Sequence, residues 1–226
     1  MEQIEEVVQN DIDPDFLKSV CILMGWAYPD LFAELVAIHG VDDAYAQETF
    51  ARRRSEAAVL ALVRAARLHG IPYEYKRLSC NGQSKLLLRI GRVVLMQEPI
   101  LTLSDEPRVS DYKQELADSH GLIRQLELDL GDRPVRNSDW SGCVLAVMLH
   151  GSAGPRFTSE HKSLGALMLA VPDAHYSQWV LRLDLHTMAT EGRGFDSHDG
   201  QESLSRQSDN VRVTLKRRYS ERESGA

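Results

Sequence analysis

Apolar and polar residues alternate most regularly between Tyr73 and Glu98, directly after the longest helical pattern of the chain. Three short strand patterns follow one another there, the first two of them alternating, separated by turn signals at Asn81-Gly82 and Gly91-Arg92. Alternation places one face of a strand against a core, and Asn-Gly is a strong hairpin signal. The pattern therefore predicts a three-stranded meander, which is the scaffold for any functional site.

The segment before the meander is predicted to form three helices. The first begins at Asp13-Pro14, with the aspartate as N-cap and the proline at the first helical position, and ends near Gly25. The second runs from Pro29-Asp30 to His39-Gly40. The third spans Ala44–Leu68 and is apolar on more than one side, which places it between the other helices and the sheet.

The segment after the meander is predicted to contain both helices and strands. A short helix follows Ser110, its expected N-cap, and a second helix covers 175–190 with Asp173 as its cap. The first of the remaining strands alternates apolar and polar residues, so one of its faces is exposed to solvent. The other two are continuous apolar runs, which indicates strands buried on both faces. These three strands are expected at 124–130, 143–149 and 166–171.

These elements predict an α+β fold with N-terminal helices packed on a mostly antiparallel sheet of about five to six strands. Residues 1–69 form an acidic helical region on the sheet, and residues 70–190 form the α+β core. Residues 191–226 are rich in Gly, Ser, Asp, Glu and Arg, which predicts a flexible C-terminal tail. Its short VRVTL stretch is a candidate for ordering as an added strand on a partner.

Composition points to a soluble cytoplasmic protein. The chain has 226 residues and is 43% hydrophobic, and no apolar run approaches the ~18–20 residues that span a bilayer. Its N-terminus is acidic, unlike a signal or transit peptide. Cys21, Cys80 and Cys143 are widely spaced, which indicates reduced thiols and argues against a structural zinc site.

Charge is distributed unevenly along the chain. The formal net charge is −7, yet residues 1–50 carry eleven acidic residues and a single lysine, whereas residues 51–108 carry eleven basic and five acidic residues. Three interpretations follow: the acidic head docks on the basic sheet of its own chain, a partner protein meets one of the faces, or the basic region meets phosphates. A fourth interpretation is that the acidic and basic faces are both simply exposed to solvent.

Glu74 and Lys76 are the only pair with a recognisable catalytic spacing. Alternate residues share one side of a strand, and metal-dependent nucleases of the PD-(D/E)xK type place a metal ligand and a lysine in this way. Such a site needs a second carboxylate, for which Glu127 and Asp129 are candidates. Glu74 and Asp129 would then hold Mg²⁺ or Mn²⁺. A helix precedes Glu74 where these nucleases have an acidic strand, so a plain surface ion pair is the competing interpretation.

Two further groups are candidates for function. His150 ends a buried strand and opens the sequence HGSAG, which suggests an anion cradle or a His150–Ser152 pair, with a plain turn as the alternative. Arg64 and Arg67 share one face of the long helix and are candidates for nucleic-acid phosphates. The acidic total charge disfavours that role, since dedicated nucleic-acid binders are usually basic.

The functional hypothesis is a non-catalytic protein-interaction module that needs no cofactor. It would be an accessory, inhibitor or antitoxin-like subunit of a bacterial complex, with a basic surface of another protein as the partner of its acidic head. The alternative is a divergent metal-dependent nuclease that uses Glu74, Lys76 and Asp129. A small-molecule enzyme built on His150 and Ser152 is a third possibility.

Overall fold

The computed structural model describes most of the chain up to Thr190. It covers residues 2–40, 44–77, 82, 84–102, 104–119 and 143–190. Chain contacts separate a unit Met1–Thr190 from a unit Glu191–Ala226, and the predicted tail in the second unit lies outside the described residues.

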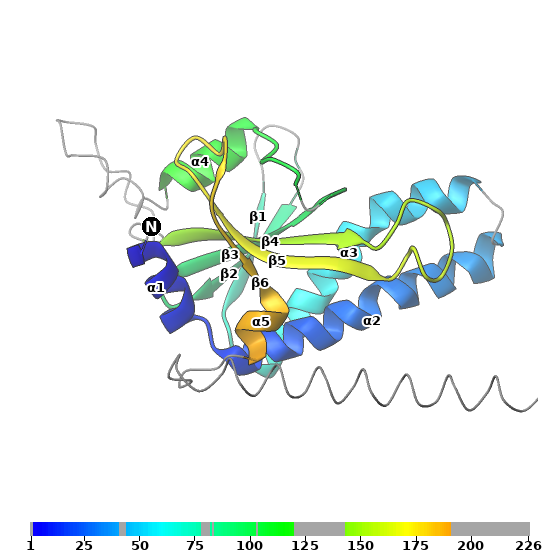
Figure 1. The fold of residues 1–226 in the computed structure, drawn as a ribbon, viewed down its shortest axis with the longest axis horizontal. Helices are drawn as coiled ribbons and strands as arrows, with labels where there is room; N and C mark the ends of the chain where they lie inside the picture. Colours follow the sequence, from blue (N-terminus) through cyan, green and yellow to red (C-terminus); the bar gives the residue numbers. More distant parts are fainter. Residues whose placement is uncertain are drawn as a thin grey trace, which may run out of the picture. The chain divides into compact units, whose positions relative to one another are not determined.

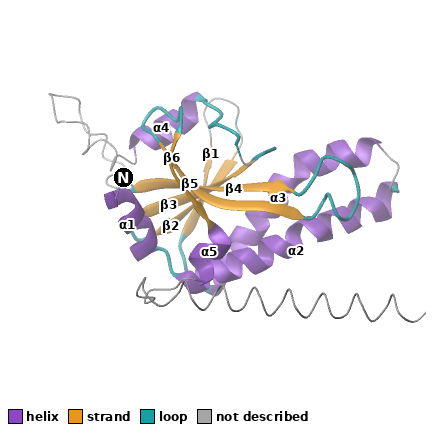
Figure 2. Ribbon diagram, viewed as in Figure 1, coloured by secondary structure: helices purple, strands orange, loops and turns teal. Residues whose placement is uncertain are grey.

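The described fold is α+β, as predicted, with N-terminal helices packed on a six-stranded mixed sheet (Figures 1 and 2). The helices are α1 (Glu2–Asp11), α2 (Pro14–His39), α3 (Ala44–Leu68), α4 (Asp111–Ser119) and α5 (Leu185–Thr190). The strands are β1 (Tyr73–Arg77), β2 (Ser84–Ile90), β3 (Val93–Pro99), β4 (Val144–Ser152), β5 (Leu164–Pro172) and β6 (Trp179–Asp184).

The strands lie in the order of the sequence, β1 to β6. The predicted meander is confirmed: β1 pairs with β2 and β2 with β3, both antiparallel, and Leu88 lies opposite both Tyr73 and Leu95. The β2–β3 turn is tight because Gly91 takes a φ of +56°, a conformation that side chains other than glycine rarely adopt. The junction of β3 with β4 is parallel, and the remaining pairs are antiparallel.

The apolar runs at 143–149 and 166–171 are β4 and β5, as expected, and the predicted strand at 124–130 lies outside the described residues. The helix predicted over 175–190 is wrong, because 175–178 form a turn, Trp179–Asp184 are β6, and only Leu185–Thr190 are helical, as α5. Asp173 accepts hydrogen bonds from the backbone N–H groups of Ser177 and Gln178, so it closes the β5–β6 turn instead of capping a helix.

The two helices predicted between Pro14 and His39 are one continuous helix, α2, so that prediction is also wrong. Its start agrees with the sequence, since Asp13 accepts a hydrogen bond of 2.8 Å from the N–H of Asp15. Pro29 removes one backbone donor, and its ring faces the carbonyl of Gly25 one turn earlier. Burial of one continuous face outweighs that loss; its residues are Phe16, Leu17, Val20, Met24, Tyr28, Leu31 and Leu35.

Each face of the sheet has its own apolar core. One core joins the sheet to α1, α2, α3 and α5, and the other lies between the opposite face and α4. In Figure 1 the paired helices α2 and α3 run past the ends of β4 and β5, beside the loop that connects those strands. Phe157 of that loop packs against Phe32 of α2 and Phe50 of α3.

Two further observations concern helix ends and length. Ser110 directly precedes α4 as predicted, but its buried hydroxyl makes no hydrogen bond to the described residues, and its carbonyl accepts from Lys113 and Gln114. Helix α2 is long and apolar enough to cross a membrane by length and composition, which the two-helix prediction concealed. The core helix of a globular protein and a signal sequence near an N-terminus pass the same test, and 28% of the apolar window of α2 is buried.

Candidate functional site

The polar residues buried in the sheet gather where the parallel strands β3 and β4 end. Gln97 and Glu98 lie near the end of β3, and His150 lies near the end of β4, opposite Pro99. Because neighbouring residues of a strand face opposite sides, Gln97 and His150 face the helices α2 and α3, and Glu98 faces α4. Two buried polar clusters therefore lie back to back across the sheet.

His150 is the centre of the cluster on the α2–α3 side. It has no exposed surface, and its Nε2 lies 2.7 Å from Oε1 of Gln97. The amide oxygen only accepts, so Nε2 carries the proton, and Nδ1 accepts the hydrogen bond of 2.6 Å that Tyr28 donates. The ring thereby links α2, β3 and β4 inside the core.

The ionisation of this cluster follows from its burial. Loss of solvent lowers the pKa of His150 to about 3, with a smaller contribution from the positive charge of Arg54. Burial also raises the pKa of Tyr28 well above its ordinary value. At neutral pH both groups are uncharged and bound to each other, so neither ring nitrogen of His150 is free to move a proton to a substrate.

Two cations lie beside this cluster. Arg54 of α3 is 9% exposed and donates from Nη1 to the carbonyl of Ile100, while its Nε has no hydrogen-bond partner among the described residues. Lys162 is 6% exposed, donates to the carbonyls of Gly154 and Pro155, and lies 5.4 Å from the ring centre of Phe50. Burial and the charge of Arg54 lower the pKa of Lys162. Lys162 thereby links the β4–β5 loop to Phe50 of α3, and Arg54 links α3 to the residue that follows β3.

The second cluster joins Glu98, Lys113 and Tyr176 on the α4 side. Lys113 Nζ lies 2.5 Å from Oε1 of Glu98 and donates to the carbonyl of Arg108, and the Tyr176 hydroxyl donates to Oε2 of Glu98 at 2.8 Å. Burial lowers the pKa of Lys113, and burial together with Glu98 raises that of Tyr176. Tyr176 takes a φ of +55°, which the surrounding contacts hold in place. The cluster ties α4 and the β5–β6 turn to β3.

The sequence patterns single out only some of the residues in these two clusters. Gln97 and Glu98 are two successive polar residues at the end of an apolar strand pattern. Because neighbouring residues of a strand face opposite sides, this pair indicates one polar side chain in the core on each face of the sheet. Lys113 and Arg54 carry no such signal, because charged residues on helices are usually exposed. Only their three-dimensional surroundings mark them as buried.

The predicted nuclease pair lies apart from both clusters. Glu74 and Lys76 are exposed on β1, an edge strand, where they lie opposite Leu87 and Lys85. The carboxylate expected from Asp129, like Glu127, lies outside the described residues. In the part of the chain that the structure describes, no three His, Cys, Asp or Glu side chains are grouped to hold a metal ion.

The HGSAG segment does not bring Ser152 to His150. The Ser152 hydroxyl contacts the carbonyl of Gly154, at 3.4 Å. The backbone N–H groups of Ala153 and Gly154, which an anion cradle would use, donate to the carbonyls of Ser163 and His161. These bonds close the base of the β4–β5 loop.

The predicted phosphate-binding pair has two different surroundings. Arg67 donates from Nε to the Tyr73 hydroxyl at 3.1 Å, so it joins the end of α3 to the edge strand. Arg64 is exposed and lines a groove between α2 and α3.

This surface depression has a volume of about 240 Å³, and its lining combines apolar and charged residues of both helices. Trp26 and Leu60 line it while remaining 65% and 52% exposed, and Ile22, 61% exposed, lies one turn before Trp26. We call the surface formed by these three residues and the groove the hairpin face. The other groove residues are Leu23, Ala27, Asp30, Leu31, Glu34, Arg53, Glu56, Ala57, Ala61 and Arg64.

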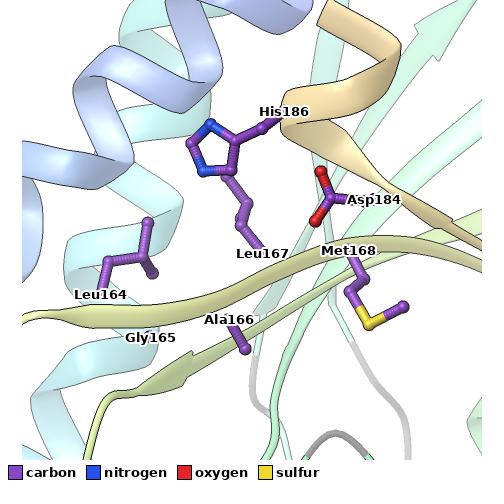
Figure 3. Close-up of a pocket in the computed structure, with 7 residues that line it drawn as sticks. All are labelled: Leu164, Gly165, Ala166, Leu167, Met168, Asp184 and His186. Atoms are coloured by element: carbon purple, nitrogen blue, oxygen red, sulfur yellow. The ribbon is translucent and has the colours of Figure 1, made fainter. Parts of the chain in front are cut away.

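The second depression lies between β5 and the start of α5 (Figure 3). Its volume is about 230 Å³, and Asp184 and His186 are its only ionisable lining residues. Asp184 accepts a hydrogen bond from the backbone N–H of Thr187, which is the role of an N-cap for α5. Asp184, at the end of β6, therefore has a structural role in this depression as the cap of α5.

Comparison of the chain with protein-family models, with curated proteins and with solved structures found no match.

Proposed function

We propose that this chain is a non-catalytic protein-interaction module and that the hairpin face is its docking surface. The observation that carries the proposal is the exposure of Trp26, Leu60 and Ile22 around one groove. Single exposed apolar residues are ordinary, but three large ones gathered beside a groove whose lining also carries charged residues resemble the aromatic anchors and polar rims of protein interfaces.

The buried polar clusters favour a binding role over a catalytic one. His150 has no exposed surface, and Glu98 and Lys113 are each less than a tenth exposed. Their donors and acceptors are directed at one another, so they stabilise the scaffold that supports the helices. A catalytic group needs contact with substrate, which these side chains lack.

The rim of the groove favours a protein partner over a lipid surface. Asp30, Glu34 and Glu56 carry negative charge beside Trp26, and Arg53 bonds both of the glutamates. Insertion of Trp26 into a bilayer would carry Asp30 toward hydrocarbon, where an unpaired ion costs roughly 3 kcal/mol at the centre. A protein surface supplies counter-charges for the same rim.

Site-specific crosslinking tests the proposal whatever the identity of the partner. The photoreactive residue benzoylphenylalanine replaces Trp26 in the full chain, in cells that naturally make the protein, and replaces Tyr75 in a control. Tyr75 is 53% exposed on the edge strand β1, away from the hairpin face. We expect a discrete protein adduct from position 26 that position 75 does not give. Equal labelling from both positions, no adduct from position 26, or labelling of lipid alone would overturn the docking surface.

A further inference from the structure

We infer that the partner of the hairpin face is a second copy of this chain, related by a two-fold axis that brings Asp30 of each copy to Arg64 of the other. The inference rests on the proposed docking surface and adds the identity of its partner. It is carried by the order of the charges along the hairpin face.

The register of α2 against α3 is set by contacts at both ends of the pair. Arg53 bonds Glu34 at 2.6 Å near one end, and His69 bonds Ser19 at 2.8 Å near the other. The helices run in opposite directions, so these two contacts place Trp26 of α2 and Leu60 of α3 at nearly the same height. The apolar centre of the hairpin face is therefore level across both helices.

Unlike charges lie on opposite sides of this centre. Asp30 is four residues after Trp26, or roughly 6 Å toward the α2–α3 connection, and Arg64 is four residues after Leu60, roughly 6 Å in the opposite direction. No hydrogen bond or ion pair joins either side chain to another described residue. By contrast, Glu34 already pairs with Arg53.

A two-fold axis at the height of Trp26 and perpendicular to the helices makes this surface complementary to itself. The rotation places the Asp30 end of one copy over the Arg64 end of the other, and it does so twice, while Trp26 meets Trp26 at the centre. An arrangement with the helices parallel would place Asp30 near Asp30 instead, which like-charge repulsion disfavours. The charge pattern thus selects the antiparallel association.

Charge reversal tests this pairing directly by light scattering and sedimentation of the purified full chain at about 100 µM. We expect a dimer of the wild-type chain, and monomers of Asp30→Arg and of Arg64→Asp, with dissociation constants raised at least about tenfold. The double variant Asp30→Arg/Arg64→Asp should dimerise again. A mixture of the two single variants should form a heterodimer, because both of its charge pairs are then of opposite sign.

The control is Glu74→Arg, a charge reversal on the edge strand, which should leave the dimer intact. A wild-type chain that stays monomeric at this concentration, or single variants that dimerise like wild type, would overturn the inference. The crosslinking experiment separates this failure from failure of the docking surface. An adduct of twice 25.4 kDa supports the second copy, whereas an adduct of another mass retains the docking surface and rejects self-association.

Discussion

Asp11 accepts three hydrogen bonds from Arg92. Its Oδ1 accepts from Nη2 at 2.7 Å, and its Oδ2 accepts from Nε at 3.0 Å and from the backbone N–H at 2.7 Å. Asp11 is the last residue of α1, and Arg92 lies in the β2–β3 turn. The contact joins the acidic beginning of the chain to its own basic sheet, which is the first of the three interpretations of the charge asymmetry.

The first prediction concerns this contact. Asp11→Ala should lower the free energy of unfolding by about 1–2 kcal/mol, because it removes a bidentate ion pair and leaves the Arg92 N–H without its acceptor. Urea denaturation measures the change. Glu48→Ala is the control, since its ion pair with Arg52 is exposed and should contribute less than about 0.5 kcal/mol. Equal losses of unfolding free energy for the two variants would show that the contact of Asp11 with the β2–β3 turn contributes no more than an exposed ion pair.

The second prediction separates backbone strain from steric conflict at the same turn. Gly91 and Gly70 both have positive φ, +56° and +64°. A Cβ at position 91 would lie 2.6 Å from Oδ2 of Asp11, whereas nothing lies within 4 Å at position 70. Gly70→Ala should cost about 1–2 kcal/mol from strain alone, and Gly91→Ala should cost more because it also displaces Asp11. Thermal unfolding of both variants measures the two losses of stability, and a larger loss for Gly70→Ala than for Gly91→Ala would contradict the prediction.

The third prediction is a pH dependence caused by His150. Its pKa is about 3 in the folded chain and about 6.5 when unfolded, so the unfolded state binds a proton that the folded state excludes. The contribution of His150 to the free energy of unfolding is fully present above about pH 6.5. It is lost as the pH falls toward 3, by up to about 1.4 kcal/mol per pH unit. The slope of unfolding free energy against pH should be smaller for His150→Asn. An unchanged slope would contradict a buried neutral ring.

The fourth prediction concerns the ion pair between Glu98 and Lys113. Lys113→Met leaves the Glu98 carboxylate buried without its cation and should cost about 3–5 kcal/mol. The double variant Glu98→Leu/Lys113→Met removes both charges and should recover much of the loss, although the Tyr176 hydroxyl then lacks its acceptor. Denaturation of both variants measures the difference. A double variant no more stable than Lys113→Met would rule out this explanation.

The fifth prediction addresses the nuclease alternative. Glu74 and Lys76 are exposed on an edge strand, so Glu74→Ala and Lys76→Ala should each change stability by less than about 0.5 kcal/mol. A binding module should cleave neither DNA nor RNA in the presence of Mg²⁺ or Mn²⁺. Metal-dependent cleavage by the purified chain that disappears in both variants would establish the alternative and overturn the non-catalytic proposal.

Prediction from the sequence succeeded where the local pattern and the final surroundings agree. The bounds of α3 and the three meander strands follow from periodicity and from the glycine turns. It failed between Pro14 and His39, where Gly25 and Pro29 are local breaking signals that a continuous buried face overrides. It also failed at 175–190, because the apolar spacing around Trp179 and Leu183 suits a short helix as well as a strand.

The sequence by itself determined the α+β class, the meander and the exposed position of Glu74 and Lys76 on one side of a strand, since these depend on neighbours within a few residues. Only the tertiary structure decided that His150 meets Tyr28, a residue 122 positions away, and that Trp26 stays exposed on a helix whose other face is buried. The physical reason is that burial and long-range hydrogen bonds are set by the packing of distant segments, which local periodicity does not record.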